Sequence, residues 1–180
     1  IGDGMGAGHA MATESYIRDI KKGETPLMMT FPVTGLISTY SASSPVTDSA
    51  AAGTALSTGS KTRNSMLGMA ADTTEVYSLA STLRNEGYGI GLVTNVAPDD
   101  ATPGAFYAHV PNRKMYYEIG CQAAESGYAF IAGSNWRGLT DKQGNLTDLP
   151  QKFTEAGYVT VRGTAGLDTI TSAKIVMLGT

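Results

Sequence analysis

The 180-residue sequence has only one cysteine, few charges and no long apolar run, and each shortage excludes a class of protein or of site. Cys121 is the only cysteine, so an internal disulfide and a cysteine-rich zinc site are both excluded. Thirteen basic and sixteen acidic residues give 13 − 16 = −3, with no basic block, so no nucleic acid is expected as a partner. No apolar run has the length of a membrane span.

Glycine, by contrast, is abundant. The chain has 22 glycines, whereas average usage predicts about 13 in a chain of this length. Several gather in turns such as Gly2-Asp3-Gly4-Met5-Gly6, which indicates that the backbone approaches something closely there. Because Ile1 reads as the last step of an apolar strand and residues 175–178 as a buried strand, we expect the domain to be incomplete at both ends.

Short apolar runs alternate with helical stretches, and no repeat or linker divides the chain. This order is typical of a layered α/β domain with a largely parallel sheet. Residues 134–150, which include Trp136, are expected to form an exposed excursion because turn residues recur there. We predict helices over 10–21, 49–56, 76–85, 113–125 and 152–155, and strands over 33–40, 89–94, 128–132, 158–161 and 175–178.

The first candidate site residue is Asp3, which lies between glycines after the expected strand end. Ligands bind at the carboxyl ends of strands in open α/β sheets, and a carboxylate there can bridge metal ions. The alternative is a tight turn in which Asp3 bonds to its own backbone.

The second candidate is Ser49, in the run Thr47-Asp48-Ser49-Ala50-Ala51-Ala52-Gly53. A helix that begins here presents unpaired N–H groups to an anion, and the small residues are expected to leave open space around the serine. A serine hydroxyl needs activation, and since neither histidine lies in a triad motif, a metal ion is the expected activator. The alternative is that Ser49 merely caps the helix.

A third group follows the strand predicted at 89–94. Asp100 and Thr102 provide two oxygens of the kind that magnesium prefers, although a surface turn is the alternative. Arg113 is expected to open a helix after Pro111-Asn112 and is able to bind phosphate with two donors, unless it is simply solvated.

Together, the glycine-rich Asp3 turn, the Thr47–Ala55 run, Asp100-Ala101-Thr102-Pro103 and Ala108-His109-Val110-Pro111-Asn112-Arg113 closely resemble the alkaline phosphatase family. The resemblance extends over nearly the whole chain and is weakest at 134–150. It implies a three-layer α/β/α fold, of which residues 1–180 would be the N-terminal portion of a single catalytic domain.

The resemblance also implies roles for individual residues. Ser49 matches the serine that becomes phosphorylated, Asp48 the neighbour that orients an arginine, and Arg113 that phosphate-clamping arginine. Asp3 matches the aspartate that bridges a zinc and a magnesium ion, and Ser49 also touches zinc. Asp100 and Thr102 match two magnesium ligands; the aspartate is typical of the bacterial form. The implied reaction is phosphate monoester hydrolysis through a phosphoserine, assisted by two Zn²⁺ and one Mg²⁺.

The family's remaining metal ligands would come from beyond position 180, so the chain alone is expected to be inactive. His9 and His109 match no zinc ligand. The implied partners are a phosphomonoester, inorganic phosphate and a second copy in a homodimer, and the implied location is periplasmic or extracellular. Two alternatives are a related metal-dependent phosphodiesterase or sulfatase, and a truncated non-catalytic module that binds phosphate or magnesium.

Overall fold

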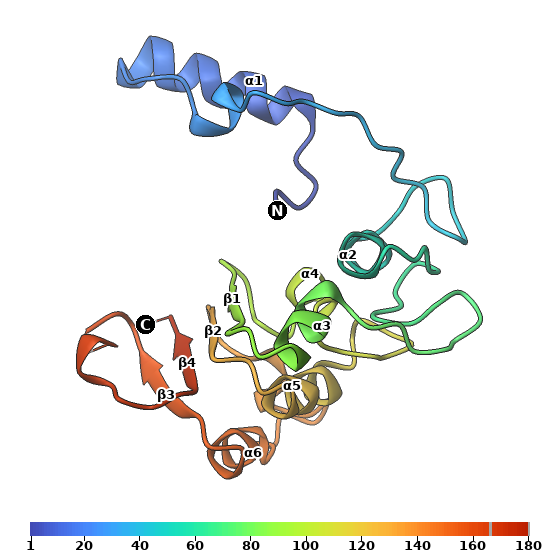
Figure 1. The fold of residues 1–180 in the computed structure, drawn as a ribbon, viewed down its shortest axis with the longest axis vertical. Helices are drawn as coiled ribbons and strands as arrows, with labels where there is room; N and C mark the ends of the chain where they lie inside the picture. Colours follow the sequence, from blue (N-terminus) through green and yellow to red (C-terminus); the bar gives the residue numbers. More distant parts are fainter. Residues whose placement is uncertain (166, 180) are drawn as a thin grey trace. The chain divides into compact units, whose positions relative to one another are not determined.

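A computed structural model describes residues 1–165 and 167–179, and the chain divides into two compact units. Unit 1 is Ile1–Thr39 and unit 2 is Tyr40–Thr180 (Figure 1). Within the residues described, no helix has both the length and the apolar character of a membrane span.

Unit 1 consists of one helical stretch followed by extended chain. Helix α1 spans Ala7–Ser15 and continues as the π-helical turn η1, Tyr16–Lys21, so the predicted helix is confirmed with an earlier start. A 3₁₀ turn, η2, covers Leu27–Thr30. The strand predicted over 33–40 is wrong, because those residues are exposed and form no ladder with any described residue.

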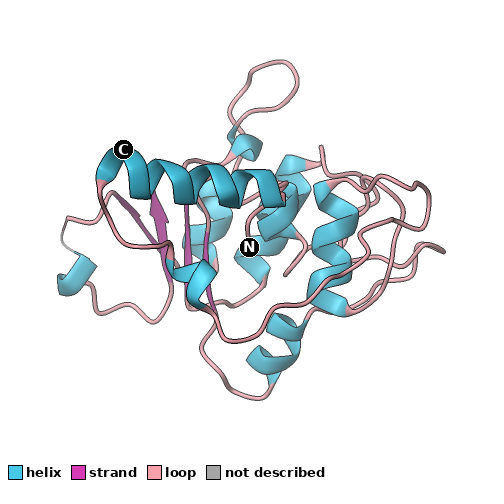
Figure 2. Cartoon of the chain, turned by 90° about the horizontal axis from the view of Figure 1, so that it is seen from above, coloured by secondary structure: helices cyan, strands magenta, loops and turns pink. Residues whose placement is uncertain are grey.

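Unit 2 is built on a four-stranded parallel sheet (Figure 2). The order in the sheet is β1-β2-β4-β3, so β1 and β2 are neighbours although 36 residues of chain (94–129) separate them. All four strands agree with the predicted ones to within two residues; they are β1 Gly91–Val93, β2 Phe130–Gly133, β3 Val159–Arg162 and β4 Ile175–Leu178.

The core of unit 2 lies between one face of this sheet and two helices, α5 (Tyr116–Glu125) and α6 (Leu149–Glu155). Side chains alternate along a strand, so Ile131 and Val176 share the face that packs on the helices, and both are completely buried. The remaining helical elements are α2 Ser49–Thr58, α3 Leu79–Asn85, α4 Ala101–Gly104, η3 Arg137–Leu139 and η4 Leu167–Thr169.

Two helices begin three residues later than predicted, for local reasons. The Ser78 hydroxyl accepts the Ser81 N–H at 3.1 Å and caps α3, which ends the preceding extended chain. Before α5, Asn112 accepts the N–H of Lys114 through its side chain at 2.9 Å and holds a turn instead of a first helical turn.

The segment 134–150 is exposed at its tip and buried at its base. Residues 140–146 are exposed, whereas Trp136 is 6% exposed and packs on Phe153 with ring centroids 4.7 Å apart. Gly138 is also buried, and a Cβ there would lie 2.8 Å from the Tyr116 carbonyl oxygen. Glycine therefore lets η3 lie directly against the beginning of α5.

Candidate active site

Helix α2 begins at Ser49, and its capping residue is Asp48. One carboxylate oxygen of Asp48 accepts the Ala51 N–H at 2.9 Å, while Ser49 is the first helical residue and is half-buried. Because Asp48 already fills the capping role, the alternative interpretation of Ser49 as the cap does not apply. The serine thus sits at a helix N-terminus whose dipole favours an anion.

The small residues of α2 serve close packing of the helix, and the open space expected around Ser49 stays a prediction. Ala50 and Ala51 are buried, and a Cβ on Gly53 would come within 3.0 Å of the Ala105 Cβ. The buried Ser57 hydroxyl donates to the Ala105 carbonyl at 2.7 Å. The small side chains let α2 pack closely on α4 and the residue after it, which holds the Ser49 helix beside the segment that carries Asp100 and Thr102.

The main chain of Ser65 connects Asp48 with Arg113. Its N–H donates to the second carboxylate oxygen of Asp48 at 3.0 Å, and its carbonyl accepts the Arg113 N–H at 2.7 Å. Ser65 has φ +74°, a left-handed conformation that a non-glycine residue adopts at some energetic cost. Ser65 makes both bonds in this conformation.

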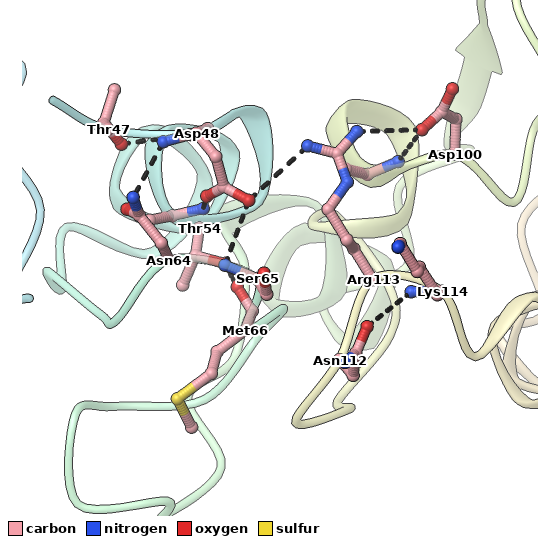
Figure 3. Close-up of polar contacts among 12 residues, drawn as sticks. Thr47, Asp48, Thr54, Asn64, Ser65, Met66, Asp100, Asn112, Arg113 and Lys114 are labelled. Atoms are coloured by element: carbon pink, nitrogen blue, oxygen red, sulfur yellow. Dashed lines mark hydrogen bonds and ion pairs between the residues drawn. The ribbon is translucent and has the colours of Figure 1, made fainter.

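Figure 3 shows the Arg113 guanidinium between two carboxylates of unit 2. Its Nη1 lies 3.5 Å from Asp48 and its Nη2 3.2 Å from Asp100, with 28% of the side chain exposed. Arg113 stands in the turn before α5, so the expectation that it opens a helix is wrong. It is not merely solvated, because two acidic partners fix its planar group.

Asp100 makes more contacts than a residue of a surface turn. One oxygen accepts the Ala101 N–H at 2.7 Å, which caps α4, and also faces Arg113. The other oxygen lies 2.9 Å from Nη2 of Arg137, and only 14% of the side chain is exposed. Asp100 therefore lies between two guanidinium groups, and Thr102 follows as the second residue of α4.

The sequence alone did not identify Arg137, although the topology provides a signal for it. Strands β1 and β2 are parallel neighbours, so the loops that leave their carboxyl ends emerge at the same sheet edge. Asp100 follows β1 and Arg137 follows β2, and the Ser134 N–H donates to the Val96 carbonyl at 2.9 Å between these two loops.

Asp99 holds the main chain of the loop that carries Arg137. Its fully buried carboxylate accepts the N–H groups of Arg137 at 3.1 Å and of Gly138 at 2.8 Å. Burial raises the pKa of Asp99, and the two backbone hydrogen bonds oppose that rise. Adjacent aspartates thus have different tasks, because Asp99 holds the main chain of the Arg137 loop, whereas Asp100 caps α4 and holds two arginine side chains.

The other candidates have local structural contacts. Asp3 belongs to unit 1, where it lies exposed in a turn closed by the Met5 N–H and the Gly2 carbonyl at 3.2 Å. His9 accepts the Gly6 N–H at 3.2 Å at the start of α1. His109 contacts the Gly68 carbonyl at 2.7 Å through Nδ1.

Within the ranges 1–165 and 167–179, no group of three or more His, Cys, Asp or Glu residues is arranged to hold a metal ion. Unit 2 does bring together five of the predicted site residues: Asp48, Ser49, Asp100, Thr102 and Arg113. A helix N-terminus whose capping carboxylate also holds a guanidinium is an arrangement that can bind a tetrahedral anion.

Comparison with known proteins gives consistent matches. The family model described as "Alkaline phosphatase" matches residues 1–133. The tissue-nonspecific alkaline phosphatase of Gallus gallus is 34% identical over 165 residues, which cover 83% of this chain and 30% of that protein. Alkaline phosphatase 4 of Bacillus subtilis (strain 168) is 32% identical over 168 residues, covering 88% of this chain and 36% of that protein.

A solved structure of a mutant TAB5 alkaline phosphatase with Mg bound has a TM-score of 0.84 and 31% sequence identity, and the match covers 98% of this chain and 50% of that one. With the parallel sheet and its helices, this likeness confirms the three-layer α/β/α fold class. The chain spans about a third of the length of the curated relatives it matches.

Proposed function

Because this chain belongs to the alkaline phosphatase family, we propose that it takes part in hydrolysing phosphate monoesters through a phosphoserine formed on Ser49. One observation carries the proposal: Asp48 caps the helix that begins at Ser49 and, with its other oxygen, faces the guanidinium of Arg113. The nucleophile and the phosphate-binding cation thereby share one positioning residue.

In the proposed reaction, the Ser49 Oγ loses its proton and attacks phosphorus. The bond from phosphorus to the ester oxygen breaks, and that oxygen leaves with the electron pair and takes up a proton to become the alcohol. Water then loses a proton as it attacks the phosphoserine, the Oγ–phosphorus bond breaks, the serine oxygen takes up a proton, and inorganic phosphate is released. Arg113 donates to non-bridging oxygens with its two terminal nitrogens, and the N-terminus of α2 also favours the anion. Asp48 and Asp100 hold the guanidinium plane in orientation throughout.

Two Zn²⁺ and one Mg²⁺ are proposed as cofactors on the strength of the family. Asp3, Ser49 and Thr102 carry oxygen donors that suit such ions. When bound, the ions would supply activation of a hydroxyl and of water and would neutralise phosphate charge. Most of their ligands would have to come from outside residues 1–180.

Asp100 fits direct coordination of magnesium poorly. Three of its roughly four acceptor positions are taken, by the Ala101 N–H, Arg113 and Arg137. A divalent cation in contact with the same carboxylate would also face repulsion from both guanidinium groups. We therefore assign Asp100 to the arginines instead of to the inner coordination shell of the metal.

The test uses the full-length enzyme with Ser49→Ala and, as a matched control, Ser60→Ala, a half-buried serine just beyond the other end of the same helix. With p-nitrophenyl phosphate as substrate, Ser49→Ala is expected to lower kcat by at least about a thousandfold, while the control keeps wild-type kcat. Mass spectrometry of acid-quenched wild-type enzyme should find phosphate on Ser49. Comparable turnover by the Ser49→Ala variant would refute the assignment.

The same assay separates the alternative functions. Faster turnover of bis-p-nitrophenyl phosphate or of a sulfate ester than of the monoester would favour a phosphodiesterase or a sulfatase. Phosphate binding by calorimetry without turnover of any ester would favour a non-catalytic module.

We also propose a homodimer and a periplasmic or extracellular location, both on the support of the family. Light scattering of the purified full-length protein tests the first. Cell fractionation with an activity assay tests the second.

A further inference from the structure

We infer that Arg137 is a positioning residue of the phosphate site, which acts on the bound phosphate through Asp100 and Arg113. This inference rests on the proposed function. The chain of contacts runs from Nη2 of Arg137 to Asp100 at 2.9 Å and from Asp100 to Nη2 of Arg113 at 3.2 Å. Because the Asp100 carboxylate is bound on both sides, neither arginine is able to rotate without disturbing it.

Arg137 is itself held in place on its other side. Its Nη1 donates to the Tyr116 hydroxyl at 3.0 Å, and its guanidinium carbon lies 5.2 Å from the centre of the Tyr116 ring. The hydrogen bond to Tyr116 is the main reason why the pKa of Arg137 is raised, so the side chain stays cationic. An arginine that were simply solvated would make neither contact.

The main chain of Arg137 is fixed equally firmly. The buried Asp99 carboxylate accepts its N–H, and Trp136 is inserted beside Phe153 in the core. Gly138 lets the loop reach the beginning of α5. Buried contacts on both sides of an outward-facing side chain are typical of a preorganised site, in which little freedom remains to be lost on binding.

The geometry therefore makes Asp100 a bridge with a cation on each side. Without Arg137, the carboxylate loses its second partner and gains freedom to turn, and Arg113 is left with looser support on that side. The effect should appear in phosphate affinity, because the clamp on the phosphate oxygens weakens in the ground state as well as in the reaction. The Ser49 hydroxyl should be unaffected.

The experiment measures binding of inorganic phosphate to the full-length enzyme by calorimetry, together with KM and kcat for p-nitrophenyl phosphate. Arg137→Ala is expected to weaken phosphate binding and raise KM by about five- to twentyfold, with kcat changed less than KM. Arg137→Lys should recover only part of the loss, since lysine cannot contact Asp100 and Tyr116 with one planar group. Lys142→Ala, which removes an exposed cation from the same loop, should bind phosphate like the wild type.

A double substitution distinguishes positioning from direct contact. In an Arg113→Ala background, Arg137→Ala should weaken phosphate binding by less than about twofold more, because its route to phosphate is already lost. A full additional loss would overturn the inference, since it would mean that Arg137 reaches phosphate directly. Wild-type phosphate affinity of Arg137→Ala would also overturn it.

Tyr116→Phe keeps the inference testable if Arg137→Ala fails to fold. It removes only the hydroxyl that holds Arg137 and should weaken phosphate binding by about two- to threefold, and an unchanged affinity would count against the inference. Because calorimetry needs no turnover, these results stay separate from the Ser49→Ala test. If Ser49→Ala keeps its activity, the proposed reaction fails while the phosphate titrations still report on Arg137.

Discussion

Replacing Asp48 by alanine removes three contacts at once, and their separate magnitudes can be worked out. The carboxylate accepts the Ala51 N–H at 2.9 Å and the Ser65 N–H at 3.0 Å, and it faces Arg113 at 3.5 Å. Loss of a helix cap costs about 1 kcal/mol, and loss of a hydrogen bond to a half-buried N–H about 1 kcal/mol. The ion pair adds between about 0 and 1 kcal/mol, because both side chains are roughly a quarter exposed.

Only the cap acts directly on the first turn of α2, so hydrogen exchange is the appropriate measurement. A loss of about 1 kcal/mol corresponds to about fivefold faster exchange of the Ala51 N–H at 25 °C, provided that exchange proceeds by local opening. The total cost of about 2–3 kcal/mol should appear in the unfolding free energy of the whole unit. Asp48→Asn keeps an acceptor for one of the two N–H groups and should fall between Asp48→Ala and the wild type.

Asp72→Ala is a suitable control, since Asp72 is an exposed turn carboxylate that accepts the Thr74 N–H at 3.1 Å. It should leave the exchange of the Ala51 N–H unchanged. If Asp48→Ala leaves that exchange unchanged too, then Asp48 does not cap α2 in solution. Asp48 would then not be the residue that positions both Ser49 and Arg113.

Two further substitutions test the packing and the buried carboxylate. Gly53→Ala gains about 1 kcal/mol of helix propensity, but it places a Cβ 3.0 Å from that of Ala105, at an overpacking cost of about 1–3 kcal/mol. We therefore expect a lower Tm in thermal unfolding. A higher Tm would show that α2 can move away from α4. Asp99→Asn loses one of two backbone acceptors and should cost about 1–3 kcal/mol in urea unfolding. Because burial raises the pKa of Asp99 above 3.8, the folded state binds more protons, and the stability that this group contributes falls as the pH rises from about 4 through the raised pKa. The asparagine variant should lack that slope, and parallel pH profiles for the two proteins would contradict the assignment.

The elements that the sequence predicts well are those specified by neighbouring residues. Helix α2 follows from an aspartate cap, a run of alanines and a closing Gly59, which adopts φ +77°. The four strands follow from short apolar runs between turn residues. Asp48, Ser49, Asp100, Thr102 and Arg113 are each predicted from a short motif of neighbouring residues. Unit 2 brings these five residues to one site.

The failures come from contacts between distant residues. Residues 33–40 have a strand-like pattern, but a strand needs a partner ladder, which a local pattern cannot specify. Arg137 joins the site only because β1 and β2 are adjacent in the sheet, and no spacing along the chain encodes that adjacency. The packing of α4 against the small residues of α2 is likewise a contact between distant residues that sequence alone does not show.

The bridge made by the Ser65 main chain has a consequence for how this site tolerates variation. An alanine scan would find no effect at position 65, because truncating the side chain leaves in place the N–H and the carbonyl that join Asp48 to Arg113. What the position restricts is the sign of φ, so glycine and asparagine suit it and a β-branched residue does not. Over evolutionary time, such a position would show a narrow set of small and amide side chains with no chemical role of their own.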